Sequence, residues 1–220
     1  MNRRNNMKRI AIPLLLSLSL LLSGCQNTDT GSNGGDSAST GVIDTAALFS
    51  DRDLDGSYDE SAAVHIQLEG ETAVCDSDAV SIDGSRITLL DEGTYLVSGA
   101  LTDGQIVVDA GDTDKVQIVL AGASLTCADS AAIYSKSADK VFLTLAEGTE
   151  NTLTNGGSYT AIDKNNIDSV VFSKTDLTLN GSGSLTIDAQ AGHGVVSKDE
   201  LTITGGSYTV TFSPRCSPGF

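Results

Sequence analysis

The sequence has few of the residues on which metal and redox sites depend. It holds two histidines, His65 and His193, and four cysteines among 220 residues, with no C-x-x-C pair. Structural zinc needs about four such ligands at close spacing, so a transition-metal enzyme is not expected. Beyond residue 25 the cysteines are Cys75, Cys127 and Cys216, a number that permits one disulfide with a leftover thiol, or none.

Basic residues and tryptophan are also scarce. Lys and Arg number 13 against 29 Asp and Glu, the formal net charge is −16, and there is no Trp. So acidic a chain repels phosphate backbones, which argues against nucleic-acid binding, and it attracts divalent cations. A nucleophile elbow, a P-loop and a dinucleotide fingerprint are all absent.

Residues 1–24 are predicted to be a signal peptide of a bacterial lipoprotein. A basic start is followed by the apolar run "IAIPLLLSLSLLL" and by "LSGC", which resembles a lipobox ending at Cys25. Two acyl chains on Cys25 suffice for stable anchoring. Residues 25–40, rich in Gly, Ser and Asn, are then a lipidated flexible linker, and the body is expected at the extracellular face of the cell membrane. The alternative is an ordinary signal peptide with a chance cysteine.

Residues 41–220 fit a single all-β domain by length and pattern. Short alternating segments such as "VQIVL", "VFLTL", "LTLNG" and "LTITG" are separated by Gly, Asn, Asp or Ser. Three of the segments share a Ser-Lys pair, an acidic turn and a following Thr-rich strand, with 24 residues between Ser173 and Ser197. Such a period predicts a single-stranded right-handed parallel β-helix of about six rungs. A β-sandwich is the alternative.

Stacked rungs would place equivalent side chains about 4.8 Å apart. Ile133, Val171 and Val195 would point inward, and Tyr134 and Phe172 outward. Lys136, Lys174 and Lys198 would form a column beside the acids of the same turns, Asp139, Asp176 and Glu200. This column is interpreted either as a salt-bridge ladder or as a cationic strip for an anionic sugar.

Several segments together resemble one known family. "ITLLDEGTYLVSGALTDGQIVVDAG", "KVQIVLAGASLTCADSAAIYSKSADK" and the "SKxDLTIxGxGSLTI" repeats are similar to the clostridial cellulose- and acid-sugar-binding β-helix proteins, described as carbohydrate-binding-domain proteins. "FSDRDLDGSYDE" resembles their N-terminal segment. The resemblance runs from about residue 49 to 210 and implies calcium between turns, adhesion to cellulose or polygalacturonate, and no catalysis. The end, "FSPRCSPGF", departs from the family pattern and is interpreted as a truncated C-terminus.

Two acidic stretches are candidate calcium sites. Asp51, Asp53, Asp55 and Asp59 are spaced like the first half of an EF-hand loop, but position 12 is Ala62 rather than Glu, so a solvated acidic turn is the alternative. The second stretch, with Asp163, Asn165, Asn166 and Asp168, gathers hard oxygens in one loop, the alternative being a surface loop with Asx turns.

The candidate sugar-binding residues are Tyr134, Phe172, Lys136, Lys174 and Lys198. The two rings are the best outward aromatic pair in a chain without Trp, although a loop could also cover them as a small core. The expected function is a non-catalytic, calcium-aided hold on plant cell-wall polysaccharide at the cell surface. A calcium-dependent polysaccharide lyase of β-helix type and a purely structural surface adhesin are the alternatives.

Overall fold

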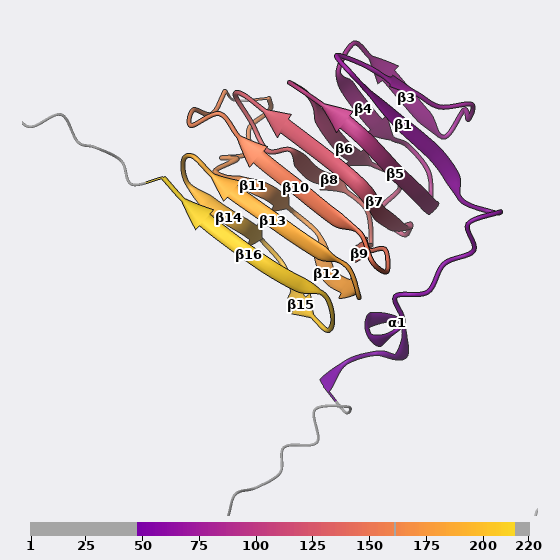
Figure 1. The fold of residues 1–220 in the computed structure, drawn as a ribbon. Coiled ribbons are helices and arrows are strands. Elements are labelled where there is room, and N and C mark those ends of the chain that lie inside the picture. Colours follow the sequence, from indigo (N-terminus) through magenta and orange to yellow (C-terminus); the bar gives the residue numbers. More distant parts are fainter. Residues whose placement is uncertain (1–47, 161, 214–220) are drawn as a thin grey trace, which may run out of the picture. The chain divides into compact units, whose positions relative to one another are not determined.

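The computed structural model describes residues 48–160 and 162–213, which fold into two β-sheets with ten and six strands (Figure 1). The predicted signal peptide, Cys25, the linker and Cys216 lie outside the described residues. In this part of the chain α1 (Asp51–Leu54) is four residues long, and no described helix has the length and apolarity that crossing a membrane requires.

The ten-stranded sheet contains β1 (Val64–Gly70), β2 (Ala73–Val74), β5 (Gly93–Leu101), β7 (Lys115–Cys127), β9 (Lys140–Leu145), β10 (Glu150–Asn155), β12 (Asp176–Gly181), β13 (Ser184–Ala189), β15 (Leu201–Ile203) and β16 (Ser207–Phe212). The six-stranded sheet contains β3 (Val80–Asp83), β4 (Arg86–Leu89), β6 (Gln105–Asp109), β8 (Ile133–Ser137), β11 (Ser169–Ser173) and β14 (His193–Ser197).

The three Ser-Lys segments are parallel neighbours in the expected register. Val171 is the Cα partner of both Ile133 and Val195, and the strands that follow pair in the same way, Leu177 with Leu201. The inward side chains of both sheets form one large buried cluster, in which Ile118, Leu125 and Leu153 have no exposed surface. The alternation of apolar and polar residues in the sequence therefore correctly predicts which side chains of these strands point inward and which point outward.

The predicted single-stranded right-handed parallel β-helix of about six rungs is wrong for this chain. The strands form two sheets with mixed pairing, because β2 is antiparallel to β1 and β3 is antiparallel to β4. The cause lies in tight turns that the repeat does not contain. Gly84 follows Asp83 with φ +60°, and this conformation, readily adopted by glycine, turns β3 back onto β4. The Ser-Lys period therefore does not apply to the first strands, where the chain reverses at Gly84.

Cys75 and Cys127 are free thiols, which answers the open question of their pairing. Cys127 is buried at the end of β7, and burial raises the pKa of its thiol. Neither cysteine therefore forms a disulfide that links the sheets, and the described fold depends on its buried apolar side chains.

Candidate functional site

The acidic stretch 51–59 fastens the N-terminal segment to the large sheet. Ser50 and Asp53 cap α1 reciprocally: the Ser50 hydroxyl accepts from the backbone N–H of Asp53, whose carboxylate accepts from the N–H of Ser50. Asp55 and Asp59 each accept a hydrogen bond from the backbone two residues on, and Asp51 is exposed. Among the described residues no three His, Cys, Asp or Glu side chains form a group that could hold a metal ion. The fit to an EF-hand-like site is therefore poor.

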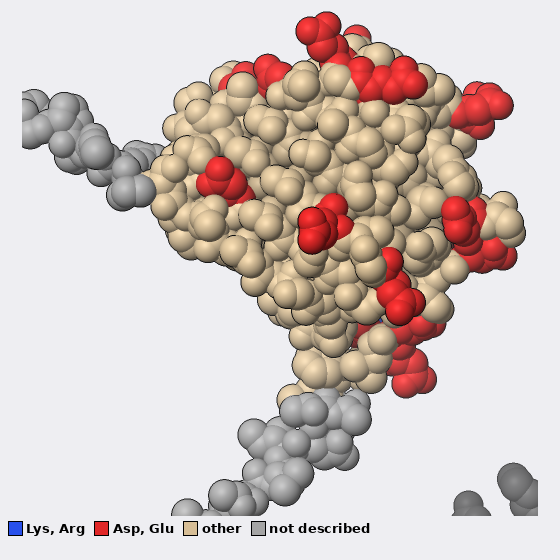
Figure 2. All heavy atoms as spheres, in the orientation of Figure 1, with Lys and Arg blue, Asp and Glu red and all other residues tan. Residues whose placement is uncertain are grey.

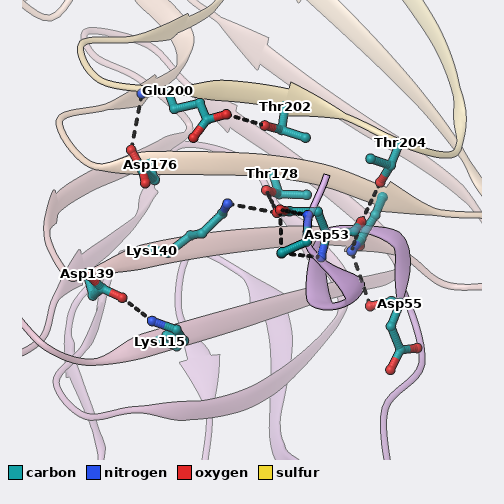
Figure 3. A network of polar contacts seen from close by, with 12 residues as sticks. Asp53, Asp55, Lys115, Asp139, Lys140, Asp176, Thr178, Glu200, Thr202 and Thr204 are labelled. Carbon is teal, nitrogen blue, oxygen red and sulfur yellow. Dashed lines mark hydrogen bonds and ion pairs between the residues drawn. The ribbon is translucent and has the colours of Figure 1, made fainter. Parts of the chain in front are cut away.

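Asp53 is the centre of a polar network between this segment and the sheet (Figure 3). Its Oδ1 lies 2.7 Å from Lys140 Nζ and accepts a 2.6 Å hydrogen bond from the Thr178 hydroxyl. Burial raises the pKa of Asp53, but hydrogen bonds from Lys140, Ser50 and Thr178 outweigh it and hold the pKa well below its ordinary value. We call residues 50–58 the N-terminal strap.

The strap crosses several strands of the large sheet. Arg52 donates a 2.8 Å hydrogen bond to Gln117 of β7 and lies 5.0 Å from the ring centroid of Phe142 of β9. The backbone carbonyl of Asp53 accepts from the Thr204 hydroxyl, just beyond β15. The acidic motif therefore has a clear structural role in this fold.

Tyr134 and Phe172 lie on the outer side of the small sheet, as predicted, but both are buried. Their ring centroids are 5.9 Å apart in an edge-to-face arrangement, and they pack with Val107, Ala131 and Ile167. Tyr159 and Ile162, from the described parts of the loop 156–168, pack against this cluster. Neither ring face is open for stacking on a sugar in this position. The structure agrees with the alternative interpretation of this pair, in which a loop covers the two rings as a small core.

Asp163 and Asn165 hold this loop against Tyr134. The Tyr134 hydroxyl donates a 2.6 Å hydrogen bond to Asp163, and the Asn165 side-chain amide donates to both of these groups. Burial raises the pKa of Tyr134 and its bond to Asp163 raises it further, so the phenol stays protonated. The oxygens of Asp163 are thus already engaged by donors, which leaves it a weak calcium ligand.

Asn166 and Asp168 offer a better partial fit to a cation. Asp168 Oδ2 accepts from the Asn166 amide at 3.2 Å, whereas its buried Oδ1 has no hydrogen-bond partner within the described structure. Calcium prefers carboxylate and amide oxygens of this kind but takes six to eight of them. These two residues could supply part of such a set.

Lys136, Lys174 and Lys198 each follow one of the paired serines Ser135 in β8, Ser173 at the end of β11 and Ser197 at the end of β14, so the predicted column exists. Its ion pairs differ from the predicted ladder. Lys136 pairs with Asp109 at 2.5 Å, and Lys198 Nζ lies 5.3 Å from the Phe172 ring centroid. Asp139 pairs with Lys115 instead.

The column adjoins a polar groove that begins at Arg86, the first residue of β4. Arg86 is the Cα partner of Gln105 in β6, and the Gln105 N–H donates to the Ser85 carbonyl at 3.0 Å. A Cβ on Gly104 would lie 2.3 Å from the Ser85 carbonyl oxygen, so glycine permits this close approach of the two turns. Local backbone packing thus sets Arg86 beside Gln105.

The groove has two adjoining parts, of about 430 Å³ and 180 Å³, both lined by Arg86 and Ile162. We call it the Arg86 groove. The larger part is lined by Ser85, Arg86, Asp103, Gly104, Gln105, Cys127, Asp129, Ser130, Thr160 and Ile162. The smaller part is lined by Arg86, Thr88, Val107, Asp109, Tyr134, Lys136, Ile162 and Asp163.

Arg86 and Gln105 carry unsatisfied polar groups at this groove. No hydrogen bond or ion pair of the exposed Arg86 guanidinium is present within the described residues, and the buried Gln105 Oε1 has no donor there. The sequence interpretation gave these residues no role. The sequence does contain a signal that could have located them. An Asp-Gly dipeptide, which marks a turn, precedes each residue, and the next strand therefore begins close to Arg86 and to Gln105.

Charge is distributed unevenly over the surface. Figure 2 shows scattered Asp and Glu and no Lys or Arg on the face that carries β10, β13 and β16. The outward side chains there include Thr186 of β13 and Thr209 of β16, which are Cα partners. Arg86 of β4 and Lys136 of β8 belong to the small sheet, whereas Lys115 of β7 and Lys140 of β9 belong to the large one. Lys115, Lys136 and Lys140 are each paired with an aspartate, whereas Arg86 has no ion pair within the described residues, so Arg86 is a cation open to an anionic ligand.

Comparison with known proteins places this groove in context. A family model described as "Carbohydrate-binding domain-containing protein" matches residues 83–215. The chain belongs to this family. The match confirms the family part of the resemblance and covers every residue that lines the Arg86 groove.

Two relatives support this placement. A carbohydrate-binding domain-containing protein of Acetivibrio thermocellus is 38% identical over 135 residues, which are 60% of this chain and 47% of that protein. The chain thus spans about half the length of this curated relative. The solved structure of the polysaccharide lyase-like protein from C. thermocellum, a gadolinium derivative, is 35% identical, with a TM-score of 0.65 over 67% of this chain and 61% of that one.

Proposed function

We propose that this carbohydrate-binding domain holds plant cell-wall polysaccharide without cleaving it, and that an acidic polymer such as polygalacturonate is its ligand in the Arg86 groove. The observation that carries the proposal is the unpaired Arg86 guanidinium in the groove. Lys136 also lines the groove but is paired with Asp109, so Arg86 is the cation available to a carboxylate. Lipid at Cys25 would keep the domain at the outer face of the membrane.

The groove offers both kinds of group that a uronate chain requires. A guanidinium can bind a carboxylate through two parallel hydrogen bonds. Asp103 and Asp129, in the larger part of the groove, can accept hydrogen bonds from sugar hydroxyls. Tyr134 and Phe172 are buried and cannot stack on a sugar ring, so polar contacts of this kind take the place of aromatic stacking.

The test is calorimetric titration with oligogalacturonate and, separately, with cello-oligosaccharide. Arg86→Ala should weaken binding of oligogalacturonate about ten-fold or more, as for the loss of a charged hydrogen-bonded contact. Lys115→Ala is the control, because Lys115 is an exposed lysine of β7 outside the groove. Equal affinity of the Arg86 variant and the wild type would place the ligand elsewhere.

The lysine column should contribute less than Arg86. Replacing Lys136, Lys174 and Lys198 together by Gln should weaken uronate binding several-fold and leave cellulose binding intact, because exposed charges are screened by solvent. If chemical denaturation shows a loss of stability with no change in affinity, the column is structural.

Calcium is proposed as an aid to binding, with Asn166 and Asp168 among its ligands. Calcium should raise the melting temperature of the wild type and strengthen retention on polygalacturonate, and EDTA should reverse both effects. Asp168→Asn should abolish the calcium-dependent rise in melting temperature, whereas Asp55→Asn should retain it. An unchanged melting temperature across the calcium titration would contradict the proposal.

A calcium-dependent lyase is the second candidate, favoured by the free Arg86 guanidinium in the groove. β-Elimination of a uronide needs a group that removes a proton, and Arg86 is the unpaired basic side chain of the groove. Lyase action would produce unsaturated uronides that absorb in the ultraviolet. We expect a flat absorbance trace with polygalacturonate and calcium; a rising trace that Arg86→Ala abolishes would establish the lyase instead.

A further inference from the structure

The larger part of the Arg86 groove contains a buried glutamine whose amide is hydrogen-bonded at one end only. Gln105, the first residue of β6, is 3% exposed. Its Nε2 donates to the Ala131 carbonyl at 2.5 Å and to the Ser130 hydroxyl at 3.2 Å, which engages both N–H groups. Because a carbonyl only accepts, the contact with Ala131 also identifies this end of the amide as the nitrogen. The other end, Oε1, has no hydrogen-bond partner within the described residues.

Gln117 of β7, the other buried glutamine in the described part of the chain, has partners at both ends of its amide. It is 2% exposed; its Oε1 accepts from Arg52 and Thr94, and its Nε2 donates to Thr144. Buried polar groups are ordinarily hydrogen-bonded, because an acceptor that has lost water and found no donor is costly. The open acceptor of Gln105 therefore indicates a donor that comes from outside the protein.

Gln105 lies where a ligand of the groove can supply this donor. Arg86 and Gln105 are Cα partners on neighbouring parallel strands, so their side chains leave the same face of the small sheet, and both line the larger part of the groove. Arg86 offers only N–H donors, whereas Gln105 Oε1 only accepts. The two side chains therefore require different groups of one ligand: a carboxylate suits Arg86, and a hydroxyl suits Gln105.

A hydroxyl fits this acceptor better than a metal ion does. The guanidinium of Arg86 beside the amide opposes a second cation. Among residues 48–160 and 162–213, no three His, Cys, Asp or Glu side chains form a group that could hold a metal ion. Asp103 and Asp129 line the same part of the groove, and one oxygen of Asp103 is already engaged by the Ala128 backbone N–H. Their remaining oxygens suit further hydroxyls of the same ligand.

We propose that Gln105 is a specificity-determining residue, whose Oε1 accepts a hydrogen bond from a hydroxyl of the uronate that Arg86 holds by its carboxylate. This inference rests on the proposed function, since it concerns the same groove and the same ligand. A site that is built to bond a hydroxyl rejects an analogue without it, because the buried partner is then left unpaired. The groove therefore selects acidic polysaccharide in which this hydroxyl is neither acylated nor etherified.

The experiment is calorimetric titration of the full chain with trigalacturonate and with deoxy analogues that each lack one hydroxyl. Deoxygenation removes a donor without adding bulk. The wild type should bind at least one analogue about ten-fold more weakly than the parent sugar. Gln105→Met, which nearly keeps the size of the side chain and removes the amide, should bind the parent about ten-fold more weakly and should no longer distinguish it from that analogue.

Gln117→Met is the matched control, because Gln117 is equally buried but lies outside the groove. It should lower the melting temperature and leave the discrimination between parent and analogue unchanged. Discrimination that persists in Gln105→Met, or that Gln117→Met also removes, would overturn the inference. If Gln105→Met does not fold, the wild type alone decides: equal affinity for the parent and every analogue overturns the role of Gln105.

Arg86→Ala separates this inference from the proposed function. If Arg86→Ala weakens binding of the parent and no analogue differs from it in the wild type, only the role of Gln105 fails. A wild type that does not bind trigalacturonate, or that binds it as tightly as Arg86→Ala does, contradicts both.

Discussion

The two ends of the sheets terminate in different ways. At the first end, β2 and β3 turn back antiparallel onto β1 and β4, and Ile87 and Leu89 behind β3 have no exposed surface. At the last described strands, β15 and β16 pair in parallel with β12 and β13, and Ile203 and Phe212 are more than half exposed. The comparison teaches that a strand which reverses direction can complete a core, whereas a strand that only continues the stack passes the exposed row onward.

The sharpest test of this difference compares two members of one apolar row. Leu179→Ala should lower the free energy of unfolding by about 3 kcal/mol, since it opens a cavity in the buried core. Ile203→Ala, one strand further, should cost about 0.5 kcal/mol, because the Ile203 side chain is 54% exposed. Urea denaturation measures both. Similar losses for the two variants would contradict this difference in burial.

The N-terminal strap contacts Thr178 of β12 and Thr204 just beyond β15, and its ion pair should have the next largest effect. Asp53→Asn should lower the free energy of unfolding by about 2 kcal/mol, because it leaves the partly buried Lys140 without its partner. Asp55→Asn is the control, since Asp55 is exposed and bonds only locally by its side chain. Denaturation with urea distinguishes them, and equal losses would contradict the role of Asp53.

The same ion pair gives a pH dependence of defined sign. The pKa of Asp53 is held below its ordinary value of 3.8, so the folded state favours the carboxylate form. Its stabilisation is therefore present above pH 3.8 and is lost as the pH falls below it toward the folded-state pKa. Between neutral and strongly acidic pH, the stability of Asp53→Asn should decline less than that of the wild type. Parallel pH curves for the two proteins would refute this assignment.

The smallest difference between a variant and its control is expected at the turn that reverses β3 onto β4. Gly84→Ala should cost about 1 kcal/mol, because φ is +60° there and no heavy atom outside the neighbouring residues lies within 4 Å of an added Cβ. Ser81→Ala, exposed on the same hairpin, is the control for side-chain loss. Thermal unfolding of the two variants separates backbone strain from side-chain effects, and no difference between them would contradict the argument.

Local repetition predicted neighbours better than it predicted architecture. The Ser-Lys spacing correctly paired Ile133, Val171 and Val195, because a strand's period of two fixes both face and register. It could not reveal that the loop 156–168 covers Tyr134, since that contact depends on Asp163 and Asn165 far outside the repeat. Arg86 escaped notice for a similar reason: its position in the groove depends on stacked turns rather than on a motif.

The groove has one wall made of strands and another made of the loop 156–168, which contributes Thr160 and Ile162. The strand wall is fixed by the pairing of β4, β6 and β8. The loop is secured at separate points, by the Tyr134 phenol and by the bond from the Thr160 N–H to the Asp129 carbonyl. Exchanges at Thr160 and Ile162 would therefore reshape the ligand's surroundings while every strand pairing stays as it is, so selectivity can evolve separately from folding.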